Sequence, residues 1–258
     1  MISNKGWSFC VVTAPGNESA LLSCIEAINL EFSNLENYEI IVVGDTNISV
    51  NKLDKVQVIH FSEEFLSLGI SNIYRFIRER SVKRLLYRTG AICHKKNLAA
   101  KKAKYNKLCM MHDYVALEKG WRKGFDKFGE EWNISMNVIN NKDGSRHRDW
   151  MSWDHPAFIN RLSACLMPYD RYNKYMYISG TYFCVKKAFF LDNLLDEKLF
   201  WGEEEDVEWS LRVRVKTVFR MNIASKVRYL KLKSLDEAPY CDTWINNEKY
   251  LLNFLDNE

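Results

Sequence analysis

Five carboxylates crowd into six positions of the stretch FWGEEEDVEWSLRVR, which spans residues 200–214. They are Glu203, Glu204, Glu205, Asp206 and Glu208. Repulsion between neighbouring carboxylates raises the pKa of some of them, and a raised pKa makes a carboxylate a better general base. The pattern from Asp206 onward predicts a helix, whose dipole favours acids in its first turn. The run therefore indicates either a proton-accepting site or simple capping of that helix.

A second candidate site is the stretch MMHDY at 110–114, where an apolar run that fits a buried strand ends at His112 and Asp113. In a parallel sheet the carboxyl ends of the strands line the ligand-binding edge. Asp113 would reach that edge and could bind a divalent cation that neutralises phosphates, with His112 as a second ligand or a pocket wall. The alternative is that Asp113 caps the turn that follows.

Tryptophans stand beside polar residues in the segment 146–155, which contains Trp150 and Trp153. Aromatic faces flanked by hydrogen-bonding groups suit sugar rings, but tryptophan clusters are also common in protein cores. Both interpretations remain open from the residues alone.

Alternating strand and helix patterns form the framework for these candidates. Buried strands are predicted at 7–16, 38–45, 56–61 and 107–111, helices at 17–32, 61–81 and 95–106, and a strand followed by a helix at 177–190. Continuous Val/Ile runs alternating with helices predict an α/β fold, with a mostly parallel central sheet flanked by helices. One edge of that sheet would then carry Thr13, Ala14, Pro15, Gly16, Gly44 and Asp45.

The composition is that of a soluble globular protein. The chain has 258 residues, of which 47% are hydrophobic and 27% charged. No apolar stretch approaches the roughly 20 residues that span a bilayer, and the N-terminus lacks the apolar core of a signal peptide. Seven cysteines without a CxxC pair fit reduced core residues and no zinc site. We therefore expect a cytoplasmic protein.

Basic residues are unevenly distributed along the chain. Twelve Lys or Arg and one acid lie between residues 71 and 107, and eight more without an acid lie between 210 and 234. These stretches fit solvated faces and lysine-protected strands, or contact with an anionic partner such as a nucleotide diphosphate or a phospholipid surface. The C-terminal stretch could also rest on an anionic lipid surface.

The order of these segments resembles GT-A fold glycosyltransferases of the inverting, family-2-like kind found in bacterial surface-polysaccharide synthesis. FCVVTAPGNES resembles the opening strand and turn of the nucleotide site, and EIIVVGD the second strand. Lys96 and Asn97 stand where the family has Arg-Asn, and Met111-His112-Asp113 where it has Asp-x-Asp. FWGEEEDVEWSLRVR closely resembles the family's Trp-Gly-x-Glu-Asp-x-Glu segment.

This resemblance implies one domain over 1–258, with a nucleotide-sugar-binding half at 1–115, a smaller acceptor and catalytic half at 116–215, and a basic extension at 216–258. It implies transfer of a sugar from a nucleotide-sugar, with UDP as the commonest nucleotide, to a saccharide or glycolipid acceptor of lipopolysaccharide or capsule type. The implied cofactor is Mn²⁺ or Mg²⁺. With such an acceptor, the basic C-terminal stretch could rest on the cytoplasmic face of the inner membrane, near a lipid-linked acceptor.

Individual roles follow from the same resemblance. Asp206 is the favoured general base and Glu205 its rival, and Asp113 is the metal ligand. The expected donor-binding residues are Thr13, Ala14, Pro15, Asp45, Lys96, Asn97 and His112. The expected acceptor-side residues are Trp150, Trp153, Gly180, Trp201 and Glu204.

Two other functions compete with this one. A nucleotidyltransferase also binds nucleotides over such a sheet, but the sequence lacks a glycine-rich pyrophosphate motif such as GxGxxG. The basic stretches could bind nucleic acid, but they lack both an interleaved aromatic pattern and a helix-turn-helix signature. We therefore expect no nucleic-acid partner.

Overall fold

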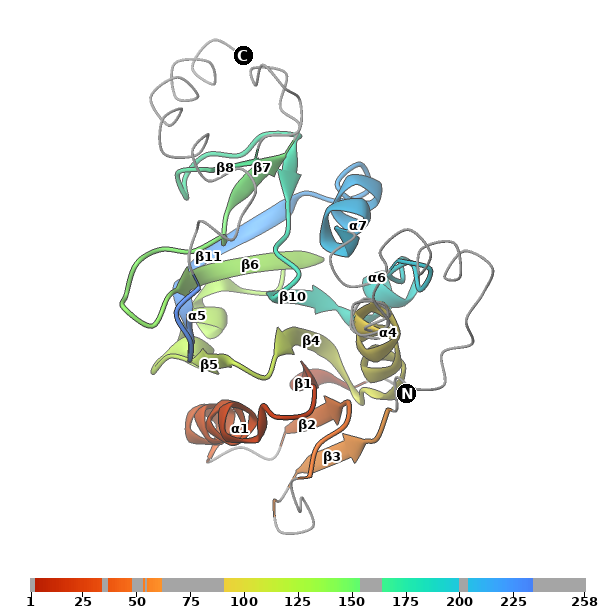
Figure 1. Cartoon of the computed structure of the whole chain (residues 1–258). Helices are drawn as coiled ribbons and strands as arrows, with labels where there is room; N and C mark the ends of the chain where they lie inside the picture. The colour runs from red at the N-terminus through yellow and green to blue at the C-terminus, as the bar shows by residue number, and fades with distance from the viewer. Residues whose placement is uncertain are drawn as a thin grey trace, which may run out of the picture.

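The computed structural model describes residues 3–33, 37–47, 53, 55–61, 91–153, 164–199 and 204–233. These residues form two β-sheets, with helices beside the larger one (Figure 1). Most of the helix predicted at 61–81 lies outside the described residues. None of the helices in the described ranges is long and apolar enough to cross a membrane.

The larger sheet has eight strands in the order β3-β2-β1-β4-β10-β6-β11-β5. The strands are β1 (Ser3–Val12), β2 (Tyr38–Val43), β3 (Val56–Ile59), β4 (Tyr105–His112), β5 (Val115–Leu117), β6 (Ile134–Asn140), β10 (Tyr182–Lys186) and β11 (Phe219–Tyr229). Strands β1 to β4 are parallel to one another. Strand β10 is antiparallel to both β4 and β6, so β6 and its parallel partner β11 run in the direction of β4. The predicted mostly parallel sheet is confirmed.

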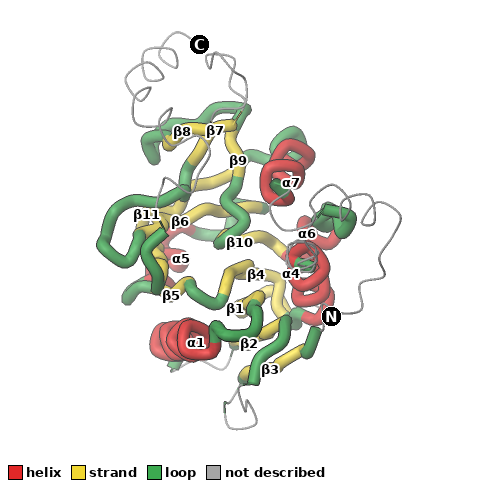
Figure 2. Tube along the Cα trace, viewed as in Figure 1, coloured by secondary structure: helices red, strands yellow, loops and turns green. Residues whose placement is uncertain are grey.

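Helices cover both sides of this sheet (Figure 2). They are α1 (Glu18–Phe32), α4 (Ile92–Lys102), α5 (Trp121–Phe128), α6 (Lys187–Leu191) and α7 (Glu205–Val213). In this view α1 and α5 lie on one side of the strands, and α4, α6 and α7 on the other. Because both faces are covered, the central strands are apolar throughout, as in all six buried residues of β2.

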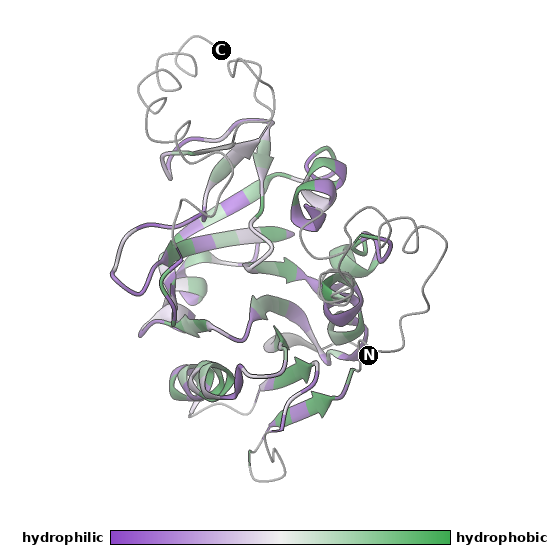
Figure 3. Ribbon diagram, viewed as in Figure 1, coloured by the Kyte–Doolittle hydropathy of each residue, from purple (hydrophilic) through white to green (hydrophobic). Residues whose placement is uncertain are grey.

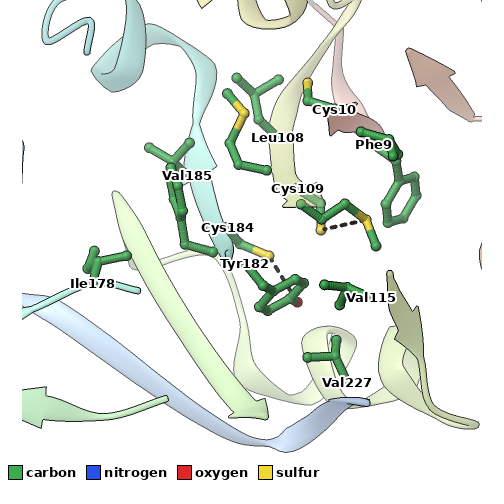
Figure 4. Packing of buried hydrophobic residues seen from close by; sticks show 14 of the residues in the cluster. Phe9, Cys10, Leu108, Cys109, Val115, Ile178, Tyr182, Cys184, Val185 and Val227 are labelled. Carbon is green, nitrogen blue, oxygen red and sulfur yellow. Dashed lines mark hydrogen bonds between the residues drawn. The ribbon is translucent and has the colours of Figure 1, made fainter. Parts of the chain in front are cut away.

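The core consists of the strands and the inner faces of these helices. Phe9, Tyr182 and Cys184 lie on one face of the sheet and Leu108 and Val185 on the other, and all five belong to the buried core (Figure 4). Figure 3 shows the apolar residues concentrated on the strands and the helix faces toward them. Each fully buried large apolar side chain stabilises the fold by about 1.5–3 kcal/mol. Five cysteines in the described part, Cys10, Cys24, Cys93, Cys109 and Cys184, are buried thiols without a disulfide.

Helix α5 packs unusually close to strand β11. The register between β11 and β6 shifts between Asn222 and Lys226, which makes the strand bulge there. Ser225 Oγ in the bulge donates to the Trp121 carbonyl at 2.7 Å. A Cβ on Gly124 would lie 2.4 Å from Ser225 Oγ and 2.5 Å from the Ala224 carbonyl oxygen, so only glycine permits this approach.

A smaller antiparallel sheet lies within residues 151–177. It contains β8 (Ala164–Leu166), β7 (Met151–Trp153) and β9 (Met176–Tyr177), in that order. Asp149 connects it to β6, because its buried carboxylate accepts from Arg146 Nε at 2.8 Å, Tyr169 Oη at 2.7 Å and the Ile139 N–H at 3.2 Å.

Candidate active site

The strand directions bring distant segments to one edge of the larger sheet. The carboxyl ends of β1, β2, β4 and β11 all lie at this edge, because these strands are parallel. Strand β10 is antiparallel to β4, so its amino end lies there too, and the His112 N–H donates to the Thr181 carbonyl at 3.1 Å. Ligands bind at this kind of edge in open α/β sheets.

The ends of β1 and β2 are held close together. The Thr13 N–H donates to the Val43 carbonyl, and Gly44 adopts φ +143°. A Cβ at Gly44 would lie 2.2 Å from the Thr13 carbonyl oxygen, so glycine is required at this position. Asp45 follows and is exposed. In the β1 turn Ala14 is half-buried and Pro15 is exposed, so both remain accessible at the edge.

Asp113 lies at the end of β4 and faces inward. Its side chain is only 2% exposed, and Oδ2 accepts from Thr13 Oγ1 at 2.7 Å. The Asn17 side chain and the Ala14 N–H also bond to this carboxylate. Burial raises the pKa of Asp113, although these donors partly offset the effect. Asp113 therefore joins the β1 turn to the end of β4.

Lysines surround the end of β4. Burial and the charges of Lys96, Lys233, Lys231 and Lys95 hold the pKa of His112 well below its usual range. Lys95 Nζ donates to the Thr13 carbonyl at 2.9 Å. This end of the strand is therefore an electropositive environment in which His112 is neutral at physiological pH.

Asp206 lies in the first turn of α7, facing the segment that leads into β10. Its Oδ2 accepts the Gly180 N–H at 2.7 Å, and its Oδ1 accepts the Val207 N–H at 2.9 Å. A Cβ on Gly180 would lie 2.9 Å from the Asp206 Cβ, so glycine allows this close approach. Asp206 remains half-buried, and each carboxylate oxygen has a second lone pair available for another donor.

A buried lysine completes the contacts around Gly180. Lys96 is 1% exposed, and its Nζ donates to the Gly180 carbonyl at 2.7 Å. The same Nζ lies 3.9 Å from Glu205 Oε1. Burial raises the pKa of Glu205, the Asp206 charge adds to this effect, and Lys96 opposes it. Glu205 therefore belongs to a buried ion pair, whereas Asp206 is the more accessible acid.

A second hydrogen bond fixes helix α7 against the same segment. Ser210 Oγ accepts the Ile178 N–H at 2.9 Å and donates to the Asp206 carbonyl at 2.6 Å. Glu204 precedes the helix with φ 60° and ψ 43°, a left-handed conformation that costs a non-glycine residue about 1 kcal/mol or more. The chain thus turns sharply just before the two acids.

Comparison with solved structures identifies this architecture. One similar structure is that of GalNAc-T7 with UDP, GalNAc and Mn²⁺, with a TM-score of 0.58 and 15% identity. The match covers 89% of the present chain and 44% of the GalNAc-T7 chain. The chain covers 60% of the S. aureus TarS 1–349 structure and matches over 86% of its own length, with a TM-score of 0.53 and 11% identity. The same TarS piece in complex with UDP gives a TM-score of 0.52 at 12% identity.

The chain has the GT-A fold. It spans less than two thirds of either neighbour. No protein-family model matches its sequence, and the comparison with curated proteins finds no match. The likeness therefore concerns the GT-A fold and not a sequence family.

Other predicted site residues lie farther from this edge or inside the protein. Asn97 is fully buried. Its Nδ2 donates to the Leu195 carbonyl and its Oδ1 accepts the Leu195 N–H, so it connects α4 to the segment before α7. Trp150 and Trp153 are 2% and 7% exposed, as expected for core tryptophans, and Trp150 Nε1 donates to the Arg171 carbonyl. Trp201 lies outside the described residues.

Two lysines beyond β11 were not singled out from the sequence. Lys231 Nζ and Lys233 Nζ lie 4.0 Å and 4.7 Å from the centroid of the Tyr114 ring, at the end of β4. Apolar and basic residues alternate in VRYLKLK at 227–233, and this alternation predicts that the strand pattern continues past Tyr229 to these lysines. Tyr177 was also not predicted as a site residue. It is buried, and burial together with the charges of Asp206 and Glu204 raises its pKa.

The expected cation at Asp113 does not fit the groups around this carboxylate. A carboxylate that binds a cation must present an oxygen lone pair to that cation, but Asp113 is buried and accepts from three protein donors. The lysines beside His112 repel a cation. Over the described ranges, no three His, Cys, Asp or Glu side chains come together as a metal-binding group.

Proposed function

We propose that the protein is a glycosyltransferase that moves a sugar from a nucleotide-sugar, most simply a UDP-sugar, to a hydroxyl of a saccharide or glycolipid acceptor. The observation that carries this proposal is the fixed position of Asp206 at the sheet edge where β1, β2 and β4 end. A proton acceptor beside a nucleotide-binding edge is what such a transfer requires.

The nucleotide-sugar donor would bind at the ends of β1, β2 and β4. Asp45 and Thr13 would contact the nucleoside, with Ala14 and Pro15 in the same turn. Two observations support this assignment: the four residues lie at one edge, and the GT-A neighbours GalNAc-T7 and TarS were solved with UDP. Asp113 would act indirectly, by holding Thr13 and the turn in place.

The reaction would be a single displacement with inversion. The acceptor oxygen bonds to the anomeric carbon, while the bond from that carbon to the diphosphate oxygen breaks and its electron pair leaves with the nucleoside diphosphate. The hydroxyl proton passes to a carboxylate. Asp206 suits this role better than Glu205, because Glu205 is more deeply buried and paired with Lys96.

The acceptor would approach from the side of the smaller sheet. Glu204, exposed at the start of α7, and Tyr177 of β9 lie near Asp206 on that side. Gly180 serves this region by positioning Asp206. Acceptor contacts by Trp150, Trp153 and Trp201, and contact with an anionic membrane, stay predictions, as does the division of the chain into halves at 115 and 215.

The sequence resemblance implies Mn²⁺ or Mg²⁺, and the GalNAc-T7 structure contains Mn²⁺. A divalent cation in such a site supplies positive charge to the departing diphosphate. The burial of Asp113 and the lysines around His112 do not suit such a cation.

The test is nucleotide recognition followed by turnover. The purified chain is incubated with UDP, UDP-sugars and other nucleoside diphosphates, with Mn²⁺ and separately with EDTA, and thermal unfolding and slow donor hydrolysis are measured. We expect at least one nucleotide to raise the unfolding midpoint and its sugar conjugate to be hydrolysed. A protein that no nucleotide or nucleotide-sugar stabilises under either condition is not this enzyme.

A further inference from the structure

The segment after β11 places Lys231 and Lys233 next to the end of β4. The Leu230 N–H donates to the Tyr114 carbonyl at 2.8 Å, which extends the pairing of β11 with β5. Three residues later, the Lys233 backbone exchanges two 3.1 Å hydrogen bonds with the Asn141 side chain. The backbone is thus fixed on both sides of Lys231, and the Nζ atoms of Lys231 and Lys233 both lie over the Tyr114 ring.

A third lysine approaches from the opposite side of β4. Lys95 lies near the start of α4, is 5% exposed, and reaches the Thr13 carbonyl at the end of β1. The positive end of the helix dipole disfavours a lysine at this position, and the first turn of α4 contains no acid to offset it. Concentrated positive charge at a ligand-binding edge is costly to the fold but suits an anionic ligand.

Asp113 is the carboxylate at the end of β4, and its charge attracts Lys231. Asp113 is turned inward, where Thr13, Asn17 and Ala14 donate to it. Lys95, Lys231 and Lys233 come from two segments that flank it. The arrangement therefore resembles a binding site for a phosphate-bearing anion more than a carboxylate site for a cation.

We propose that Lys231, Lys233 and Lys95 bind the diphosphate of the nucleotide-sugar donor and stabilise the departing nucleoside diphosphate in place of a divalent cation. This inference rests on the proposed glycosyltransferase function. The lysines supply positive charge to the diphosphate oxygen that receives the electron pair, while Asp206 takes the acceptor proton. Ammonium groups can serve this purpose, because catalysis at a leaving group depends on charge placed where negative charge develops.

The experiment measures the affinity of the full chain for UDP and for uridine by calorimetry, in EDTA and in Mn²⁺. The test variant is Lys231→Gln with Lys233→Gln. The matched control is Lys226→Gln with Arg228→Gln, which removes the same charge from exposed positions on β11, the strand that leads to these lysines. Thermal unfolding confirms that both variants are folded, and Lys95→Gln is a second test variant.

We expect wild-type UDP affinity to change less than about twofold between EDTA and Mn²⁺. The Lys231 and Lys233 variant should lose at least about tenfold in UDP affinity but keep its uridine affinity, since the lost contacts are to phosphates. The control should lose less than about threefold, which reflects long-range charge alone.

Two results would overturn the inference and leave the proposed function intact. One is UDP binding that disappears in EDTA, returns with Mn²⁺ and is abolished by Asp113→Asn. The other is a Lys231 and Lys233 variant that binds UDP as the wild type does. If the wild type binds no nucleotide in either condition, the proposed function itself fails.

Discussion

Gly180 and Asp206 are 26 residues apart in the chain and are joined by a 2.7 Å hydrogen bond from the Gly180 N–H to Asp206 Oδ2. The carbonyl of the same glycine accepts from Lys96 Nζ. One residue thus contacts the proposed base through its N–H and a buried cation through its carbonyl. Changes at Gly180 should therefore displace Asp206.

Adding one methyl group at Gly180 should misplace the base. The new Cβ of Gly180→Ala would lie 2.9 Å from the Asp206 Cβ, a separation that real side chains avoid. Because a displacement of about 1 Å can cost about 100-fold in rate, we expect kcat to fall by about that factor with UDP affinity nearly unchanged. Steady-state kinetics and UDP titration test this. Unaltered kcat in a folded variant would show that Asp206 does not need this position.

Asp206→Asn should abolish transfer and retain donor binding. General-base catalysis contributes about 100- to 10,000-fold, and the amide has no basic oxygen that can take the proton. Glu205→Gln is the matched comparison, and it should lose far less activity because Glu205 is buried beside Lys96. Turnover and UDP affinity are measured for both. If Glu205→Gln is the inactive variant, the roles of the two acids are reversed.

The Lys96 and Glu205 pair should show strong energetic coupling. Removing one member of a buried ion pair typically costs about 3–5 kcal/mol, because the other charge is left buried and unpaired. Lys96→Met should therefore lower the free energy of unfolding by about 3 kcal/mol. The double variant with Glu205→Met should be more stable than Lys96→Met alone. Urea denaturation of the four proteins in the double-mutant cycle measures this, and simple additivity would contradict it.

The buried carboxyl of Asp113 should make stability depend on pH. Its pKa in the folded protein is raised above the ordinary value of 3.8, so the folded state holds the proton more tightly. That contribution is present at low pH and is lost as pH rises from about 4 through the folded pKa. Asp113→Asn lacks it, so the variant should gain stability relative to wild type as pH rises. Urea unfolding at several pH values tests this, and a constant difference would argue against it.

Gly124→Ala should destabilise the protein, although alanine is the better helix former by about 1 kcal/mol. The methyl group would meet Ser225 Oγ and the Ala224 carbonyl of the β11 bulge. Overpacking of this kind costs about 1–3 kcal/mol. Lys127→Ala, at an exposed position of the same helix, is the control and should have little effect. A more stable Gly124→Ala protein would show that α5 can move away from the bulge.

The sequence predicts individual strands and helices well where the hydrophobic periodicity is strong. The buried runs ending near Val12, Val43 and His112 are strands, and the helix expected from Asp206 begins at Glu205. Because parallel strands share an edge, the sequence also predicts that Thr13, Asp45 and Asp113 lie at one end of the sheet.

The sequence does not predict features that depend on strand order or side-chain direction. The residues of β11 could equally form an edge strand or a membrane-facing segment, but the strand lies between β6 and β5. Only that position brings Lys231 and Lys233 to Tyr114. The inward direction of Asp113 and the burial of Trp150 likewise depend on partners far away in the chain, which no local pattern encodes.

The span of these contacts along the chain has a consequence for folding. The Thr13–Asp113 hydrogen bond joins residues 100 apart, and the Lys96–Gly180 bond joins residues 84 apart. Contacts that close such long loops form late, because the chain must give up the entropy of the loop first. Ligand-binding competence should therefore be among the last properties to return during refolding, after the helices and the individual strand pairs have formed.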